Sequence, residues 1–150
     1  MTSSAPSRTS PHFEDVPVGA ELPSLVKRPN EVQLFFFSAA TWDAHRTHWD
    51  IPYSVEKEKL PGILIHGHLQ GSWLGQLMTD WIGPQGWLRR VSYQNRGNAI
   101  PGDTLTIKGK VKEKREEGGK GIVVCDVWVE NQRGEQTTVG EAIAELPRKR

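Results

Sequence analysis

The hydrophobic pattern of the chain changes its period once, after residue 84, and this change restricts the fold more than any other feature. Over residues 66–81 apolar side chains recur at helical spacing, which predicts a buried helix that Gly83 and Pro84 end. Beyond that point apolar and polar residues alternate, as in strands with one face toward water. The apolar stripe of the helix consists of Leu69, Trp73, Leu74, Leu77, Met78 and Trp81.

Four strands are expected after this helix. Turn sequences at 117–121 and 131–134 separate the later ones, and the strands are predicted at 87–95, 105–112, 121–131 and 137–146. This order favours an α+β architecture in which an antiparallel sheet wraps around one long central helix. One helix cannot cover the apolar surface of such a sheet, so we expect at least a dimer.

The composition limits the classes of function. The 150 residues carry 19 Lys and Arg against 18 Asp and Glu, and a net charge of +1 gives no overall field for nucleic acid or an anionic membrane. No apolar run approaches the length of about twenty residues that a membrane span needs, and the N-terminus lacks the apolar core of a signal peptide. These features predict a cytoplasmic protein. The single cysteine, Cys125, lies in an apolar strand and is expected in the core.

The length fits a single domain, which we place at residues 12–147. Residues 1–11 are rich in Ser, Thr and Pro and predict a disordered arm, and residues 148–150 predict a solvated basic tail. Within the domain, Asn30 is expected to cap a short helix that ends near Asp43.

Polar chemistry concentrates in two short segments. Residues 43–48 read DAHRTH, and residues 65–69 read IHGHL. The first segment resembles the D-x-N-P-x-H signature of the MaoC-like (R)-specific enoyl-CoA hydratases and 3-hydroxyacyl-thioester dehydratases. The second resembles the H-G-M-L segment that opens the central helix of that family, and residues 101–105 (PGDTL) resemble the start of one of its strands. The likeness extends over about residues 12–147.

The resemblance implies a hotdog fold and the reversible addition of water to a trans-2-enoyl thioester, which gives an (R)-3-hydroxyacyl thioester. It implies that Asp43 and His48 handle the water and the protons, that the substrate is an acyl-CoA or acyl-carrier-protein thioester, and that no cofactor takes part. Where the family has Asn-Pro, this chain has His45-Arg46, which resembles the subgroup acting on branched or dicarboxylic acyl-CoA and the type 2 acyl-thioester dehydratases. Residues 79–84 resemble MaoC-like subunits that hydrate steroid side-chain thioesters.

The chemistry of hydration supports the same roles. It needs a base for the water, a proton donor for the α-carbon and stabilisation of the enolate oxygen. Asp43 at a helix end and His48 in the following loop can meet at one water. The backbone N–H of Gly67, at the positive end of the 66–81 helix, suits the thioester oxygen, and a glycine there would let the substrate approach closely. Gly71, one turn later, either keeps the substrate-facing side of the helix free of side chains or allows close packing of the helix against a strand.

Other residues near these segments are weaker candidates for substrate binding. His66 and His68 would contact the substrate, although a structural histidine or a helix cap is the alternative for each. Trp42 and Trp49 flank the Asp43–His48 pair and would wall an acyl tunnel. A cationic patch for coenzyme A phosphates, or else an ordinary solvated strand face, would comprise Arg89, Arg90 and Arg96.

Three other functions stay open. A hotdog thioesterase would use the same helix end but would release a free thiol. A silent subunit of a heteromeric hydratase would fold without turnover, yet would have no chemical reason to keep Asp43 and His48. A histidine cluster of His45, His48, His66 and His68 would form a metal site. Residues two apart on a helix point about 200° around its axis, however, so we expect no metal.

Overall fold

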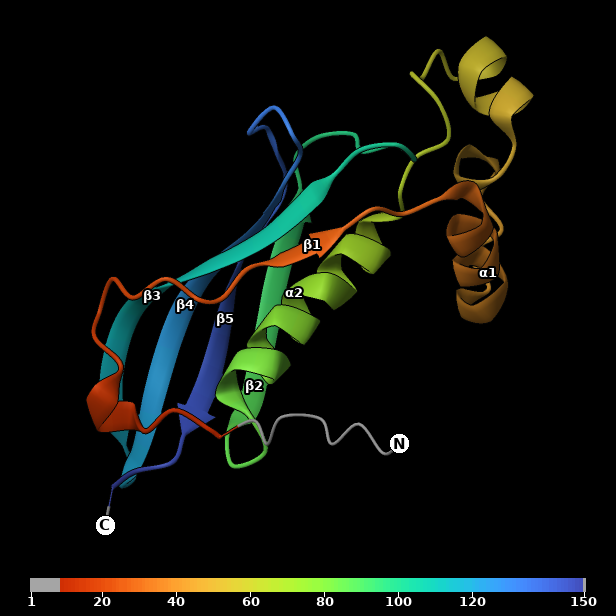
Figure 1. The fold of residues 1–150 in the computed structure, drawn as a ribbon. Coiled ribbons are helices and arrows are strands. Elements are labelled where there is room, and N and C mark those ends of the chain that lie inside the picture. The colour runs from red at the N-terminus through yellow and green to blue at the C-terminus, as the bar shows by residue number, and fades with distance from the viewer. Residues whose placement is uncertain (1–8, 150) are drawn as a thin grey trace, which may run out of the picture.

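The computed structural model describes residues 9–149, which form one antiparallel sheet with a long helix along one of its faces (Figure 1). The strand order in the sheet is β1-β3-β4-β5-β2. The strands are β1 (Leu25–Lys27), β2 (Trp87–Asn95), β3 (Leu105–Glu117), β4 (Lys120–Glu130) and β5 (Gln136–Leu146). The helices are α1 (Glu31–Thr41) and α2 (Gly67–Ile82), with the single turns η1 (Phe13–Asp15), η2 (Arg46–His48) and η3 (Tyr53–Lys57). This is the α+β architecture that the hydrophobic pattern predicts.

Helix α2 supplies one side of the core. Its side chains Leu74, Leu77 and Met78 are at most 1% exposed and pack against apolar side chains on the sheet. The opposing residues come from alternate strand positions, such as Cys125, whose thiol has its pKa raised to about 12 by burial. The predicted core position of Cys125 is therefore confirmed.

Short turns give the long strands β3, β4 and β5 their order. The turn between β3 and β4 contains Gly118 and Gly119, both with positive φ, and the turn between β4 and β5 contains Gly134 with φ of 77°. Only glycine adopts such angles without strain. The three strands therefore form a meander in which neighbours along the chain are neighbours in the sheet.

The sheet has five strands, one more than the sequence predicts. β1 is only three residues long and pairs with β3, with Leu25 opposite Ile107. Three residues are too few to establish an alternating pattern, which is why the sequence does not reveal this edge strand. β3 continues to Glu117, beyond the predicted end near residue 112.

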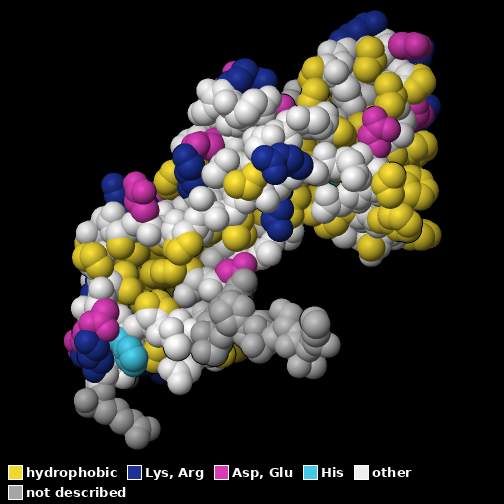
Figure 2. All heavy atoms as spheres, in the orientation of Figure 1, with side chains coloured by type: hydrophobic (Ala, Val, Ile, Leu, Met, Phe, Trp, Pro, Cys, Tyr) yellow, Lys and Arg dark blue, Asp and Glu magenta, His cyan; other side chains and the backbone are white. Residues whose placement is uncertain are grey.

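The segment formed by α1, η2 and η3 stands beside the N-terminal end of α2 (Figure 1). The predicted cap is present, because the Asn30 side chain accepts a hydrogen bond from the N–H of Gln33. Apolar side chains remain exposed on this segment, with Phe35 at 58% and Phe36 at 66%, and yellow side chains gather over α1 in Figure 2.

Both ends of the described chain contact the rest of the fold. Ser10, within the predicted arm, is buried, and its Oγ accepts a hydrogen bond from the N–H of Gln85. In the predicted solvated tail, Arg148 forms ion pairs with Glu14 and Glu116. These contacts lie on either side of the predicted domain at residues 12–147, while residues 1–8 of the predicted arm and residue 150 of the predicted tail lie outside the described part. No helix among the described residues has the length and apolar character of a membrane span.

Candidate active site

Asp43 and His48 face each other at the end of α1. Asp43 follows Trp42, which caps α1 with a left-handed φ of 58° and turns the chain out of the helix. His48 is the last residue of η2. The Oδ2 of Asp43 and the Nε2 of His48 are 3.8 Å apart, and both side chains are partly accessible. The structure therefore brings the two predicted catalytic residues together.

The hydrogen bonds of His48 fix its tautomer. Its Nδ1 lies 2.8 Å from the backbone oxygen of Leu64, and a carbonyl oxygen can only accept. The proton of the neutral ring therefore sits on Nδ1, and the lone pair of Nε2 faces Asp43. The N–H of Leu64 in turn donates to the backbone oxygen of Thr47, which holds the loop before α2 against η2. The geometry suits His48 to accept a proton at Nε2.

His66 completes a compact group with this pair. Its ring stacks on that of His48, with centroids 3.8 Å apart and planes 18° apart, and the edge of Phe37 packs against it. Its Nε2 lies 2.8 Å from Ser38 Oγ. Burial, with the neighbouring His48 as a smaller cause, lowers the pKa of His66 to about 4, so the ring is neutral at physiological pH. The contacts of Ser38 and Phe37 depend on where α1 docks, and the sequence gives no signal for them.

Gly67 begins α2 directly after His66, so its N–H is among the helix-start donors that have no acceptor within the helix. The structure shows a packing reason for glycine at this position. A Cβ on Gly67 would lie 2.0 Å from Nδ2 of Asn95 on β2, so the strand side chain occupies the place that a side chain at this position would need. At Gly71 a Cβ would lie 2.2 Å from the ring of Tyr93, which decides in favour of helix-to-strand packing.

A polar network that the sequence does not reveal, with buried residues on α2 and β5, holds the exposed Asn95 in place. Thr138 on β5 donates to Oδ1 of Asn95 at 3.1 Å, or alternatively to Oε1 of Gln70 at 3.0 Å. Thr137 also donates to Oε1 of Gln70, at 2.6 Å. Gln70 is on α2, one turn after Gly67, so the network fixes the start of the helix against β2 and β5.

The four-histidine cluster weighed above does not assemble. His45 Nδ1 lies 2.5 Å from Thr47 Oγ1, and the exposed His68 lies 3.0 Å from the hydroxyl of Tyr93 on β2. Among the described residues, the potential ligand group at the site consists of Asp43, His48 and His66, and neither His45 nor His68 belongs to it.

The two tryptophans do not enclose a tunnel within one chain. Trp42 is 90% exposed, and Trp49 is 42% exposed with its indole N–H donating to the backbone oxygen of Ala44. Trp49 instead lines an open apolar hollow of about 240 Å³ together with Phe35 on α1 and Ile63 before α2.

The three arginines of the predicted cationic patch lie along β2 and directly after it. Arg89 pairs with Glu117 and Glu145, and Arg90 donates to Ser92. Arg89 lies six residues before Asn95 along β2, which is about 20 Å from the start of α2 at the usual rise of a strand. Arg96, which follows Asn95 directly, is the arginine of the three at the same end as Gly67.

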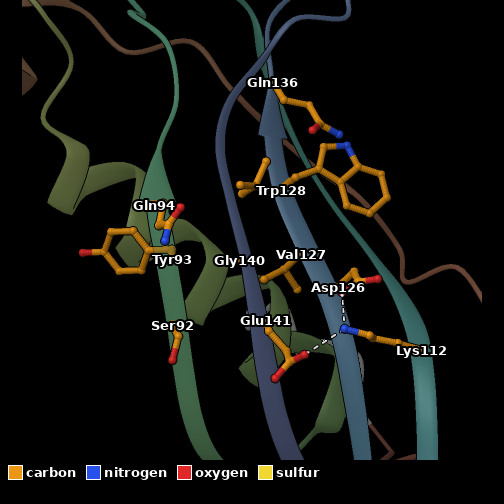
Figure 3. Close-up of a pocket in the computed structure, with 11 residues that line it drawn as sticks. Ser92, Tyr93, Gln94, Lys112, Asp126, Val127, Trp128, Gln136, Gly140 and Glu141 are labelled. Carbon is orange, nitrogen blue, oxygen red and sulfur yellow. Dashed lines mark hydrogen bonds and ion pairs between the residues drawn. The ribbon is translucent and has the colours of Figure 1, made fainter.

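A larger hollow of about 510 Å³ lies on the other face of the sheet (Figure 3). Its side chains include Trp128 and Asp126, which alternate along β4 with the core residues. Lys112 crosses it and pairs with Glu141 at 3.0 Å and Asp126 at 3.4 Å. The sheet separates this hollow from α2, so it is not part of the site at Asp43.

Known proteins show the same fold. The structure matches the R-hydratase PhaJ1 from Pseudomonas aeruginosa with a TM-score of 0.81 at 23% identity, over 93% of this chain and 88% of that one. It matches a chain of the ChsH1–ChsH2 complex from Mycobacterium tuberculosis with a TM-score of 0.75 at 20% identity, over 86% of this chain and 97% of that one. The hotdog fold expected from the resemblance is confirmed.

Sequence comparisons identify the family. A mesaconyl-C(4)-CoA hydratase from Chloroflexus aurantiacus is 49% identical over 41 residues, which are 27% of this chain and only 15% of that protein. The family model of hydroxyacyl-thioester dehydratase type 2 matches residues 5–101, which include Asp43, His48 and Gly67. The chain therefore belongs to the hydroxyacyl-thioester dehydratase type 2 family.

Proposed function

We propose that this protein adds water reversibly to a trans-2-enoyl thioester and forms the (R)-3-hydroxyacyl thioester. The observation that carries the proposal is the Asp43–His48 pair, 3.8 Å apart, close to the start of α2. A carboxylate and an imidazole with a free Nε2 lone pair are the acceptors that an attacking water needs. Membership of a family of hydroxyacyl-thioester dehydratases supports the same reaction.

In the proposed mechanism one water donates hydrogen bonds to Asp43 and to Nε2 of His48. Its oxygen attacks the β-carbon while the π electrons of the double bond move to the thioester oxygen. The N–H of Gly67, supported by the dipole of α2, stabilises the resulting enolate. The proton taken from the water is then delivered to the α-carbon, so the elements of water are added without other change. Dehydration follows the reverse path.

For the carrier, we propose coenzyme A or an acyl-carrier protein as part of the substrate. Arg96 is the first residue to examine for contacts to a phosphate, because it lies at the Gly67 end of β2 while Arg89 is paired with two carboxylates. The acyl groups to test first are the crotonyl group, the simplest enoyl group, and the mesaconyl group, named in the Chloroflexus relative.

We also propose that the protein acts as a homodimer or as part of a heteromeric assembly. The exposed apolar surface of α1, which includes Phe35 and Phe36, supports a partner that covers it. One similar chain comes from a complex of two different proteins, ChsH1 and ChsH2, which favours testing both forms of assembly.

The deciding experiment follows the loss of the conjugated enoyl-thioester absorbance, with a thiol reagent in a parallel assay. We expect hydration without release of thiol, and a decrease in kcat of about 10²–10⁴-fold in Asp43→Asn and in His48→Gln. Asp126→Asn, which changes a carboxylate on the other face of the sheet, is the matched control. Release of free thiol would establish a thioesterase, and full activity of both variants would refute the proposed pair.

A further inference from the structure

His66 lies beside the Asp43–His48 pair, but the hydration mechanism above gives it no role. One ligand atom from each of the three side chains lies within 4.8 Å of the other two. His66 is 1% exposed, and its Nδ1 has no hydrogen-bond partner among residues 9–149. A buried polar atom of this kind is unfavourable unless a small polar molecule or the substrate meets it.

The three atoms span a space of the right size for a water. No two of these atoms are more than 4.8 Å apart, so there is a point within about 2.8 Å of all three, which is an ordinary hydrogen-bond length. Bonds from zinc to imidazole nitrogen are shorter, at about 2.0–2.1 Å.

The donor and acceptor roles of the three groups suit one water. Nε2 of His48 and the carboxylate of Asp43 both accept, so a water between them donates both of its hydrogens. Such a water still needs a donor for one of its lone pairs. When the hydroxyl of Ser38 donates to Nε2 of His66, the ring carries its proton on Nδ1, which is the atom without a partner.

We propose that His66 is a third catalytic residue, whose Nδ1–H donates to the reacting water and directs its remaining lone pair at the β-carbon of the substrate. This inference rests on the proposed hydration. His66 keeps its own proton throughout, because the proton that leaves the water goes to Asp43 or His48. A neutral His66 also does not repel the positive charge that His48 gains at that step.

The kinetic test compares His66→Asn with His66→Gln. The amide of Asn reproduces the Nδ1 side of an imidazole, and that of Gln reproduces the Nε2 side, which contacts Ser38. We expect His66→Gln to lower kcat about tenfold or more and His66→Asn to lower it less. The Kd for butyryl-CoA, a saturated thioester that cannot react, should change little in either variant.

The control is His45→Gln, which changes a histidine whose ring lies 6.0 Å from His48 but which bonds to Thr47. It should retain the wild-type kcat. Equal losses in the Asn and Gln variants of His66, or losses that follow Kd and Tm instead of kcat, would give His66 a structural role and overturn the inference.

A crystal structure of the wild-type protein and of His66→Phe tests the same water without turnover. We expect an ordered water within hydrogen-bond distance of Asp43, His48 and His66, and its loss or displacement in the variant. A metal ion in its place, or the same water in both structures, would contradict the proposal. If the water is present but the protein hydrates no thioester, the proposed reaction and the catalytic role of His66 are both refuted. The water site between Asp43, His48 and His66 would still stand.

Discussion

His66 links the stability of the fold to pH. Its pKa is lowered from 6.5 to about 4, chiefly by burial, so between these values the unfolded chain binds a proton that the folded chain does not. The free energy of unfolding therefore decreases as the pH falls from 6.5 to 4, at about 1.4 kcal/mol per pH unit and by about 3 kcal/mol in total. Below pH 4 both states are protonated, and the contribution of this residue is constant.

Urea unfolding of the wild type and of His66→Phe at several pH values between 4 and 8 measures this effect. We expect the free energy of unfolding to change more steeply with pH in the wild type than in the variant between pH 4 and 6.5. Above pH 7 the two pH dependences should be parallel. His12→Gln, which changes a histidine on the surface, should follow the wild type. Parallel curves over the whole range would show that folding does not lower the pKa of His66.

At the scale of the elements, two glycines of α2 have opposite surroundings. A Cβ on Gly71 would lie 2.2 Å from the ring of Tyr93, whereas a Cβ on Gly75 would meet nothing within 4 Å. We expect Gly71→Ala to destabilise the protein by roughly 1–3 kcal/mol through overpacking. Gly75→Ala should stabilise it by roughly 0.5–1 kcal/mol, because alanine loses less conformational freedom in a helix.

Thermal or urea unfolding of the two variants checks this prediction, and each serves as the other's control because both are in the same helix. The change at Gly71 should also disturb His68, which contacts the hydroxyl of the same tyrosine. A stabilising effect of Gly71→Ala would mean that β2 and α2 separate more easily than the structure indicates.

The elements with a long periodic pattern were predictable, and those that depend on distant contacts were not. Helix α2 and the strands β2 to β5 follow from periods of 3.6 and 2. β1 is too short for any period, and its three residues pair only because β3 offers a free edge. The cap at Asn30 was predictable because it is local, with its acceptor and donor three residues apart.

The same distinction applies to the candidate site. The Asp43–His48 pair was predictable because a spacing of five and the family resemblance both point to it. The contact of Asn95 with Gly67 was not, because it needs the register of β2 against α2. The stacking of His66 on His48 likewise depends on how the loop before α2 returns to η2, which no local pattern specifies.

At the scale of the whole molecule, the apolar surface of α1 predicts assembly. Phe36 is 66% exposed beside Phe35, and burying such side chains is favourable. We expect the wild type to behave as a dimer or larger species in light scattering after gel filtration, and Phe36→Ser to shift it toward the monomer without loss of secondary structure. The control Val18→Ser, at an exposed valine outside this segment, should leave the oligomeric state unchanged. A wild type that is monomeric at high concentration would contradict this, and a mixture with a related subunit would then be tested.

The arrangement of the strands has a consequence for the order in which the molecule folds and opens. The meander of β3, β4 and β5 closes through short turns, so its contacts are local and form early. In a single protomer the segment α1–η2–η3 lies beyond this meander with large apolar side chains in water, which predicts a separate unit of low stability. Amide hydrogen exchange of the monomer should therefore be slowest in β4 and fastest in α1 and η2. Because Asp43 and His48 belong to the fast unit while Gly67 begins the slow core helix, the site can open for a bulky thioester and close again while the sheet stays folded.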